Sequence, residues 1–400
     1  MSALLLQVNR RKLWLIVGQS ALIAAVIVIA AAASARTAAR FVTGDEAMIA
    51  IAGALLLSVV GAARTSVLRL RRRVGARERL LVVGSTDADV SLTRELVDKQ
   101  PQLGIDIVGF VDVDLKCAAR APIDVDIVGT IDRVPDIVRH RRVDRVVVNL
   151  ADGRGRLPVD ELLDLRLRGI PVDHLASAYE RYTGKIVLEH LRPSWFIFSS
   201  GFQQTRTLIA AKRLLDVVVG SCGLLLVAPL MGGIAVAVKL TSRGPVFYSQ
   251  RRVGQNGQPF TIRKFRSMHV DAEAKTGAVW AMVNDPRLTP IGRWLRSTRL
   301  DELPQLWNVL AGDMSLVGPR PERPEFVSDL EREIALYGRR HLVKPGITGW
   351  AQVSYPYGAS VNDALQKLQY DLYYLKHMSI AFDMFIMLAT LKTVWSRTGC

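Results

Sequence analysis

The chain is poor in residues that build disulfide frameworks or zinc sites. Its three cysteines, Cys117, Cys222 and Cys400, lie far apart and form no C-x-x-C pair. The six histidines are scattered along the chain as well. Because disulfide frameworks and zinc sites need clustered or evenly spaced ligands, neither is expected here.

A glycine-rich dinucleotide fingerprint is also missing. The turn at 84–89 offers one glycine where the fingerprint has three, and its Asp87 and Asp89 would repel a pyrophosphate. The chain also has no Tyr-x-x-x-Lys pair. We therefore expect no bound dinucleotide. A membrane-attached nucleotide-sugar dehydratase or epimerase stays only as an alternative hypothesis.

Negative charge is scarce relative to positive charge. Acidic residues number 37 against 53 lysines and arginines, which gives a formal net charge of +16, yet half of all residues are hydrophobic. This combination indicates a membrane protein whose basic face attracts anionic lipid or phosphorylated substrates. Nucleic acid is the rival explanation, but the chain carries no recognition motif for it, so we expect no nucleic-acid partner.

Two long apolar runs, at about 13–33 and 46–63, predict an N-terminal transmembrane helical hairpin with a basic flank, together covering residues 1–78. The positive-inside bias places both outer flanks in the cytoplasm. The alternative is a cleaved signal peptide, because residues 33–35 read Ala-Ser-Ala, like a cleavage site.

Residues 79–184 alternate between short apolar strands and helical segments, which predicts a Rossmann-like parallel α/β domain. Strands are expected at 80–84, at 105–112 and up to residue 150. We expect a regulatory or assembly role for this domain rather than a redox role. Residues 185–210 are interpreted as a connector.

A third apolar segment, at about 212–240, begins the last domain, 211–400. Lys212 and Arg213 precede it and basic residues also follow it, while Pro229 interrupts its middle. Cations at both ends favour a broken, re-entrant helix whose two ends meet the same membrane face. Asp216, near one end, then avoids the bilayer centre. A simple spanning helix is the alternative.

Two further features suggest phosphate chemistry. Asn256-Gly257 between strand-like runs predicts a β-hairpin rich in cations, which is either a solvated ribbon or a phosphate-facing surface. Further along, Asp301 and Glu302 stand before a helical run, and Arg320 follows in a stiff Gly-Pro-Arg-Pro loop. Helix capping is the alternative explanation for the acidic pair. Carboxylates near a fixed arginine suit the binding of Mg²⁺ and phosphate, or attack on phosphorus.

Residues 211–400 resemble the bacterial sugar transferases, the monotopic polyprenyl-phosphate sugar-1-phosphate (phosphoglycosyl) transferases. The upstream hairpin and α/β domain resemble those of the large members. This resemblance implies a membrane α/β fold with a C-terminal α+β catalytic domain. Its matching blocks, in order, are Lys212-Arg213 with Asp216, the Pro229 break, GPVFYSQRRVG (244–254), KFRSM (264–268), LDELPQLWNVLAGDMSLVGPRPE (300–322), KPGITGWAQV (344–353) and YDLYYLKHMS (370–379).

The resemblance implies transfer of a sugar-1-phosphate from a UDP-sugar to polyprenyl phosphate. The products are UMP and a polyprenyl-diphosphate sugar that starts exopolysaccharide, capsule, O-antigen or glycoconjugate synthesis. It also implies a bacterial inner-membrane location with the catalytic domain on the cytoplasmic face, and it leaves a homodimer open. A non-catalytic regulator of polysaccharide export is the remaining alternative.

The resemblance also implies roles for single residues. Asp301 would be the nucleophile of a covalent aspartyl intermediate, and Glu302 would help it to hold Mg²⁺, or Mn²⁺ in its place. Asp371 is a further expected metal or substrate ligand. Phosphate charge would be steadied by Lys264, Arg296 and Arg320.

Overall fold

The computed structural model describes residues 77–84, 90–112, 126–148, 159–188, 201–202, 204–270, 272, 285–356, 358 and 360–395. The predicted transmembrane hairpin at 13–33 and 46–63 lies outside these residues, and so does most of the turn at 84–89.

The first described region is a five-stranded sheet in the order β3-β2-β1-β4-β5. The pairs β1–β4, β2–β3 and β4–β5 are parallel, so the predicted parallel α/β sheet is confirmed. This strand order is the one found in doubly wound sheets. The strands are β1 (Glu78–Val83), β2 (Ile105–Asp112), β3 (Ile127–Thr130), β4 (Arg145–Val148) and β5 (Val172–His174).

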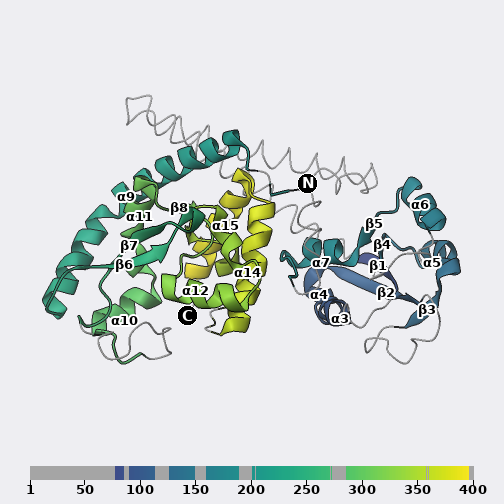
Figure 1. Cartoon of the computed structure of the whole chain (residues 1–400), viewed down its shortest axis with the longest axis horizontal. Helices are drawn as coiled ribbons and strands as arrows, with labels where there is room; N and C mark the ends of the chain where they lie inside the picture. The colour runs from purple at the N-terminus through teal and green to yellow at the C-terminus, as the bar shows by residue number, and fades with distance from the viewer. Residues whose placement is uncertain are drawn as a thin grey trace, which may run out of the picture. The chain divides into compact units, whose positions relative to one another are not determined.

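Apolar side chains from the strands and the neighbouring helices form a hydrophobic core around the sheet. Leu81, Val83 and Val146 are fully buried and pack with Val134 and Val138 of a neighbouring helix. Parallel strands are covered on both faces, which explains why they read as continuous apolar runs. Figure 1 shows the sheet in blue with its helices around it. These helices are α3 (Val90–Asp98), α4 (Gln100–Leu103), α5 (Val134–His140), α6 (Val159–Leu167) and α7 (Leu175–Thr183), with the short turn η2 (Ile131–Arg133).

The C-terminal region begins with a long helix, α9 (Arg206–Thr241), capped by Thr205, whose Oγ1 accepts a hydrogen bond from the Leu208 amide at 3.2 Å. The helix begins at Arg206, ahead of the predicted start near residue 212, and it continues through Pro229. Its re-entrant course stays a prediction. Proline removes one backbone donor, which bends a helix without ending it when the flanking turns hold. In Figure 1, α9 is one long bent helix.

Helix α9 is apolar and largely uncovered by protein. Its most apolar window has a mean hydropathy of 2.2, and 17% of that window is buried. Within the described part of the chain, it is the one helix long and apolar enough to cross a membrane. Leu225 and Leu226 leave 77% and 82% of their surface exposed. Exposed apolar side chains in such density indicate contact with lipid or with another apolar surface.

The predicted hairpin follows α9. Strands β6 (Phe247–Val253) and β7 (Pro259–Phe265) pair antiparallel, and the turn η3 (Gln255–Gly257) joins them. Asn256 and Gly257 adopt φ values of 54° and 76°, the left-handed conformation that Asn-Gly turns supply at low cost. The hairpin prediction is therefore confirmed.

The rest of the region packs around the short parallel pair formed by β8 and β9. Its core includes the buried side chains of Val309, Met314, Leu368 and Ile386. The elements are α10 (Pro290–Ser297), η4 (Leu300–Glu302), α11 (Gln305–Ala311), β8 (Ser315–Val317), α12 (Pro324–Glu333), η5 (Tyr337–Leu342), β9 (Gly346–Thr348), α13 (Trp350–Ser354), α14 (Val361–Lys376) and α15 (Ile380–Trp395).

Candidate active site

The acidic pair lies in a separate 3₁₀ turn ahead of helix α11. Asp301 and Glu302 belong to η4, whereas α11 begins after Pro304 and has no side-chain cap. The helix-capping alternative for this pair is therefore wrong. The turn starts after Arg299, whose φ of 59° is left-handed. Both acidic residues are less than a tenth exposed, so the fold buries two adjacent carboxylates without giving them a capping role.

Asn308 fixes the position of this turn relative to the hairpin. Its Oδ1 accepts a hydrogen bond from the Arg263 amide at 3.1 Å, and its Nδ2 donates to the Thr261 carbonyl at 2.8 Å. The amide therefore completes backbone hydrogen bonds of β7 from the side of α11. Because Lys264 follows Arg263 directly, this clamp sets where the Lys264 ammonium meets Glu302.

Glu302 is held by two cations. Lys264 Nζ donates to its Oε1 at 3.0 Å, and Arg320 donates from Nη2 to Oε1 at 2.8 Å and from Nη1 to Oε2 at 3.4 Å. Burial alone would raise the pKa of Glu302, but Arg320 and Lys264 outweigh it and hold the pKa well below its ordinary value. In return, Glu302 raises the pKa of Arg320. Glu302 is therefore a fixed carboxylate anion.

Asp301 is in a different state although it is the next residue. Burial raises its pKa, and repulsion by Glu302 adds to this, while Lys264, Arg296 and Arg320 oppose it. These cations act through longer-range electrostatics, because no described residue donates a hydrogen bond to the Asp301 carboxylate. A carboxylate without hydrogen-bond donors is a better nucleophile and metal ligand than one whose lone pairs are occupied.

The loop that carries Arg320 is held closely against β9 and the residues just before it. The Gly318 amide donates to the Thr348 carbonyl at 2.9 Å, and the Gly346 amide donates to the Pro319 carbonyl at 2.9 Å. A Cβ at Gly318 would lie 2.3 Å from the Lys344 carbonyl oxygen, so only glycine permits this approach. The Gly-Pro-Arg-Pro loop is therefore rigid where it presents the guanidinium.

Helix α9 holds both flanks of the site. Arg213 donates to the Val309 and Leu310 carbonyls at 2.6 and 2.7 Å, which caps the end of α11. Lys212 Nζ donates to the Val317 carbonyl at 2.9 Å and to Asp383 at 2.6 Å. The sequence predicts these cations at the membrane face; the structure gives both of them partners inside the C-terminal region.

The acidic residue of α9 has the same kind of role. Asp216 Oδ1 accepts hydrogen bonds from Ser315 Oγ at 3.0 Å and from the Leu316 amide at 2.9 Å. Asp216 is thus buried and hydrogen-bonded at the start of β8, and the prediction that it avoids the bilayer centre stays a prediction. The helix is thus tied to the strand that leads into the Arg320 loop.

The remaining predicted residues lie in two places. Arg296 Nε donates to Ser267 Oγ at 3.0 Å, and its charge opposes the rise in the pKa of Asp301. Asp371, by contrast, forms an ion pair with Arg340 at 2.7 Å and is 1% exposed. The structure does not group it with Asp301 and Glu302: among the residues described, no three His, Cys, Asp or Glu side chains are placed to hold a metal ion. Its role as a metal ligand stays a prediction that these contacts do not support.

Asp301 and Glu302 fit a divalent cation by their chemistry. They are adjacent buried carboxylates; burial and then repulsion by Glu302 raise the pKa of Asp301, and no residue in the described part of the chain donates a hydrogen bond to Asp301. Mg²⁺ prefers hard oxygen ligands and is often bound through one or two carboxylates plus substrate phosphates. A third protein ligand is therefore not required.

Sequence reasoning missed Asn308 and Arg340. Asn308 is 4% exposed and lies in α11 between Trp307 and Val309, and a polar residue at a core position was the available signal. Arg340 Nη2 donates to the Arg320 carbonyl at 3.1 Å, which fixes the catalytic loop from behind. No local pattern around residue 340 marks this contact.

A cation-held carboxylate, an adjacent carboxylate without a donor and a rigidly mounted arginine together form a centre suited to phosphoryl transfer. The family model of the bacterial sugar transferases matches residues 207–397, and a model described as a CoA-binding domain matches residues 5–154. The chain is 33% identical to the UDP-glucose:undecaprenyl-phosphate glucose-1-phosphate transferase of Xanthomonas campestris pv. campestris over 80% of its own length and 68% of the relative's. The chain belongs to the bacterial sugar transferase family.

Two further relatives show the same likeness. The UDP-glucose:undecaprenyl-phosphate glucose-1-phosphate transferase of Klebsiella pneumoniae is 36% identical, over 80% of this chain and 68% of the relative. The UDP-N-acetylgalactosamine-undecaprenyl-phosphate N-acetylgalactosaminephosphotransferase of Aeromonas hydrophila is 41% identical over 58% of this chain. The aligned part is 54% of that relative's length, about half of it. The names of these relatives contain different sugars.

Proposed function

We propose that this protein transfers a sugar-1-phosphate from a UDP-sugar to polyprenyl phosphate, giving a polyprenyl-diphosphate sugar and UMP. The observation that carries the proposal is the asymmetry of the acidic pair. Glu302 is locked by Lys264 and Arg320, whereas Asp301 is buried beside it without a hydrogen-bond donor among the described residues. Three relatives whose names contain this class of reaction support it.

The reaction divides into two displacements. In the first, an Asp301 oxygen attacks the phosphorus that bears the sugar; the bond from that phosphorus to the bridging oxygen breaks, and UMP leaves with the electron pair. In the second, an oxygen of the prenyl phosphate attacks the same phosphorus, and the Asp301 carboxylate leaves. A covalent carboxylate intermediate replaces one difficult step by two easier ones.

The cations of the site make the first attack feasible. A diphosphate repels an approaching carboxylate. Arg320 and Lys264 are paired with Glu302, the residue next to Asp301, so their positive charge would offset charge on the phosphoryl oxygens at the same place. Arg296 also acts on Asp301 through its charge. A Mg²⁺ or Mn²⁺ ion held by Asp301 and Glu302 would add positive charge between nucleophile and donor.

Helix α9 would attach the active site to the membrane. A prenyl chain cannot leave the bilayer cheaply, at about 0.8 kcal/mol per CH₂ group. We infer that α9 lies in the bacterial inner membrane as a re-entrant helix, with the catalytic region on the cytoplasmic face. Its contacts through Lys212, Arg213 and Asp216 would then hold the active site at the depth of the prenyl phosphate. A homodimer remains a prediction.

The test is UMP release by membranes that contain the full chain. Release should require a UDP-sugar and a divalent ion, and sustained turnover should also require prenyl phosphate. Asp301→Asn should abolish it. Asp329→Asn is the matched control, because that side chain is 64% exposed in a surface ion pair. If no UDP-sugar yields UMP, the regulator of polysaccharide export becomes the better hypothesis.

A further inference from the structure

One buried polar side chain close to the acidic pair is not used by the mechanism above. Gln305 is 2% exposed, and its Nε2 has no hydrogen-bond partner among the described residues. A buried N–H group without an acceptor costs free energy, so its presence in a native fold calls for an explanation. Asn308 of the same helix, α11, is 4% exposed and uses both atoms of its carboxamide on β7. The fold therefore satisfies one buried amide of α11 and leaves the other unbonded.

Gln305 lies on the same face of the chain as Asp301. The two residues that join η4 to α11 have helical dihedral angles, with φ values of −53° and −61°, so the backbone stays helical between them. Residues four apart in such a run are neighbours, with Cβ atoms about 5–6 Å apart. Asn308 follows three residues after Gln305 and meets β7, the strand that carries Lys264. The shared face is therefore turned towards the cations of the site.

The unused groups of Asp301 and Gln305 are complementary. No described residue donates a hydrogen bond to the Asp301 carboxylate, and none accepts one from Gln305 Nε2. The two neighbours are therefore not hydrogen-bonded to each other either. A group that lies between them must accept a hydrogen bond from the amide and present an electrophile or a cation to the carboxylate. A phosphoryl group meets both needs, because its oxygens accept hydrogen bonds and its phosphorus is open to attack.

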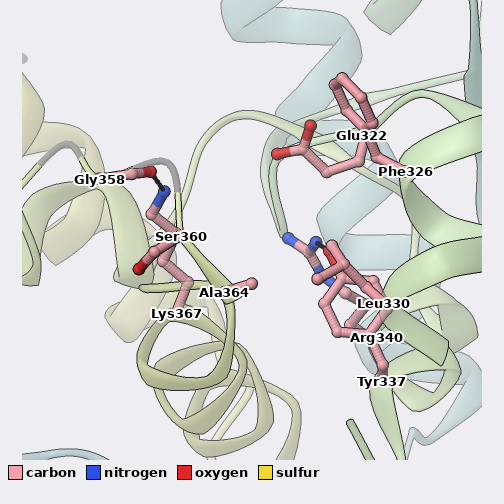
Figure 2. Close-up of a pocket in the computed structure, with 9 residues that line it drawn as sticks. All are labelled: Glu322, Phe326, Leu330, Tyr337, Arg340, Gly358, Ser360, Ala364 and Lys367. Carbon is pink, nitrogen blue, oxygen red and sulfur yellow. Dashed lines mark hydrogen bonds between the residues drawn. The ribbon is translucent and has the colours of Figure 1, made fainter. Parts of the chain in front are cut away.

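The hollow beside the Arg320 loop does not compete for this phosphate. Figure 2 shows Glu322 and Arg340 on one of its walls and Lys367 on the other. Its volume is about 30 Å³, which suits water-sized groups only. A sugar phosphate is several times larger, so the donor phosphate has to lie at the acidic pair.

We propose that Gln305 is a further catalytic residue, whose Nε2 donates a hydrogen bond to a non-bridging oxygen of the phosphoryl group that Asp301 attacks. This inference rests on the proposed function. A fixed donor at that oxygen stabilises the charge that the oxygens carry in the transition state. A neutral amide does so without forming an ion pair with Asp301, so the nucleophile stays available. No bond is made or broken at Gln305.

The first test is Gln305→Met in the full chain in membranes. This change removes the donor and keeps a side chain of similar length. The kcat of UMP release should fall about 100-fold, with a smaller change in KM for the UDP-sugar. The melting temperature should stay constant or rise, because an unbonded buried N–H group is lost. Gln305→Asn keeps the amide one methylene further away and should have an intermediate kcat.

Gln369→Met is the matched control. Gln369 is also 2% exposed and has a buried Oε1 without a hydrogen-bond partner in the described part of the chain, but it lies on α14. The same substitution there removes an equally buried, unsatisfied amide away from the acidic pair. Its kcat should equal that of the wild type.

Sulfur substitution in the donor tests the contact itself. A UDP-sugar with sulfur in place of one non-bridging oxygen on the sugar-bearing phosphorus exists as two diastereomers. Sulfur is a weak hydrogen-bond acceptor, so the diastereomer that places it opposite Gln305 should react more slowly than the other. This difference should shrink in Gln305→Met and persist in Gln369→Met, because two changes to one contact are not additive.

The outcomes separate the hypotheses. A slow but stable Gln305→Met protein with a reduced diastereomer difference supports the inference. A wild-type kcat in this variant overturns it, and so does a lower kcat that comes with a lower melting temperature and an unchanged diastereomer difference. If Gln305→Met does not fold, Gln305→Asn undergoes the same comparison, and a wild-type kcat and diastereomer difference overturn the inference. If the wild type releases UMP from no UDP-sugar, the proposed function fails and the inference fails with it.

Discussion

Two carboxylate–arginine pairs flank the same loop, Glu302 with Arg320 and Asp371 with Arg340. Both carboxylates are buried, and both ion pairs are short, at 2.8 and 2.7 Å. The arginines differ: the Arg320 side chain is 35% exposed and that of Arg340 is 5% exposed. One pair is open to a ligand, and the other is sealed inside the fold.

Their electrostatic surroundings differ as well. Glu302 has a second cation, Lys264, and its pKa is held well below the ordinary value although burial opposes this. For Asp371, burial raises the pKa in spite of Arg340. An open site with surplus positive charge can receive phosphate, whereas a sealed one-to-one pair can only position its neighbours. Similar side chains thus serve chemistry in one place and architecture in the other.

Among the substitutions that test this comparison, Asp301→Asn should have the largest effect on activity. The amide cannot form the acyl phosphate, so UMP release should fall by about a thousandfold or more. The melting temperature should stay constant or rise, because the change removes repulsion between Asp301 and Glu302. Activity assays with thermal unfolding of the same preparation separate the two effects. Retained activity would remove Asp301 from the mechanism.

Breaking the sealed pair should mainly cost stability. Arg340→Met leaves Asp371 buried without its cation, which should cost about 3–5 kcal/mol of folding free energy. Replacing both partners, as Arg340→Met with Asp371→Leu, should recover much of that loss. Thermal unfolding of the three variants measures it. An Arg340→Met protein as stable as the wild type would contradict the division of roles.

Arg320→Lys tests the role of the exposed ion pair, Glu302 with Arg320. Lysine keeps the charge but loses the planar fork that contacts both oxygens of Glu302. We expect kcat to fall about 10- to 100-fold with little change in melting temperature, because one preorganised donor to the phosphoryl group is lost. A large loss of stability with normal kcat would show that this pair is architectural too.

The smallest effect should come from the start of α14, the helix that carries Asp371. Ser360 and Asp363 form a capping box, with Ser360 Oγ accepting from the Asp363 amide at 3.1 Å. Ser360→Ala should cost about 1 kcal/mol. Hydrogen bonds from the Ser360 side chain and backbone lower the pKa of Asp363 to about 2.

The pH dependence of this cap follows from the lowered pKa of Asp363. The hydrogen bonds to ionised Asp363 stabilise the folded protein fully at pH values above the pKa of Asp in the unfolded chain, about 3.9. This stabilisation is lost as the pH falls towards the folded-state pKa of about 2. The difference in melting temperature between Ser360→Ala and the wild type should therefore shrink between pH 6 and pH 3. A difference that does not depend on pH would exclude the contribution of Asp363.

Local patterns predicted the elements with a clear signature. The strand at 105–112 has the predicted bounds, and Asn256-Gly257 forms the predicted turn. The family motifs also predicted that Lys264 and Arg320 would serve the same site as Glu302. Local sequence could not supply the contacts between distant residues. Arg340 meets Arg320 and Asp371, and Asn308 meets β7, through packing that no periodicity encodes.

Helix α9 shows the limit of reading charges locally. The positive-inside bias treats Lys212 and Arg213 as cations at a membrane surface, yet tertiary structure uses both to hold the catalytic region. Pro229 lies inside α9, and the helix continues through it with a bend (Figure 1). Tertiary contacts decide the role of Lys212 and Arg213, and the intact helical turns around Pro229 decide that the helix continues.

The central claim is that Asp301 becomes covalently bound to the sugar phosphate. The most direct measurement is the mass of the protein after incubation with a UDP-sugar and a divalent ion, without prenyl phosphate, followed by a quench. The account predicts a hexose-phosphate adduct on the peptide that contains Asp301, lost on addition of prenyl phosphate and absent in Asp301→Asn. Full turnover without any adduct at this position, or an adduct on another residue, would contradict it.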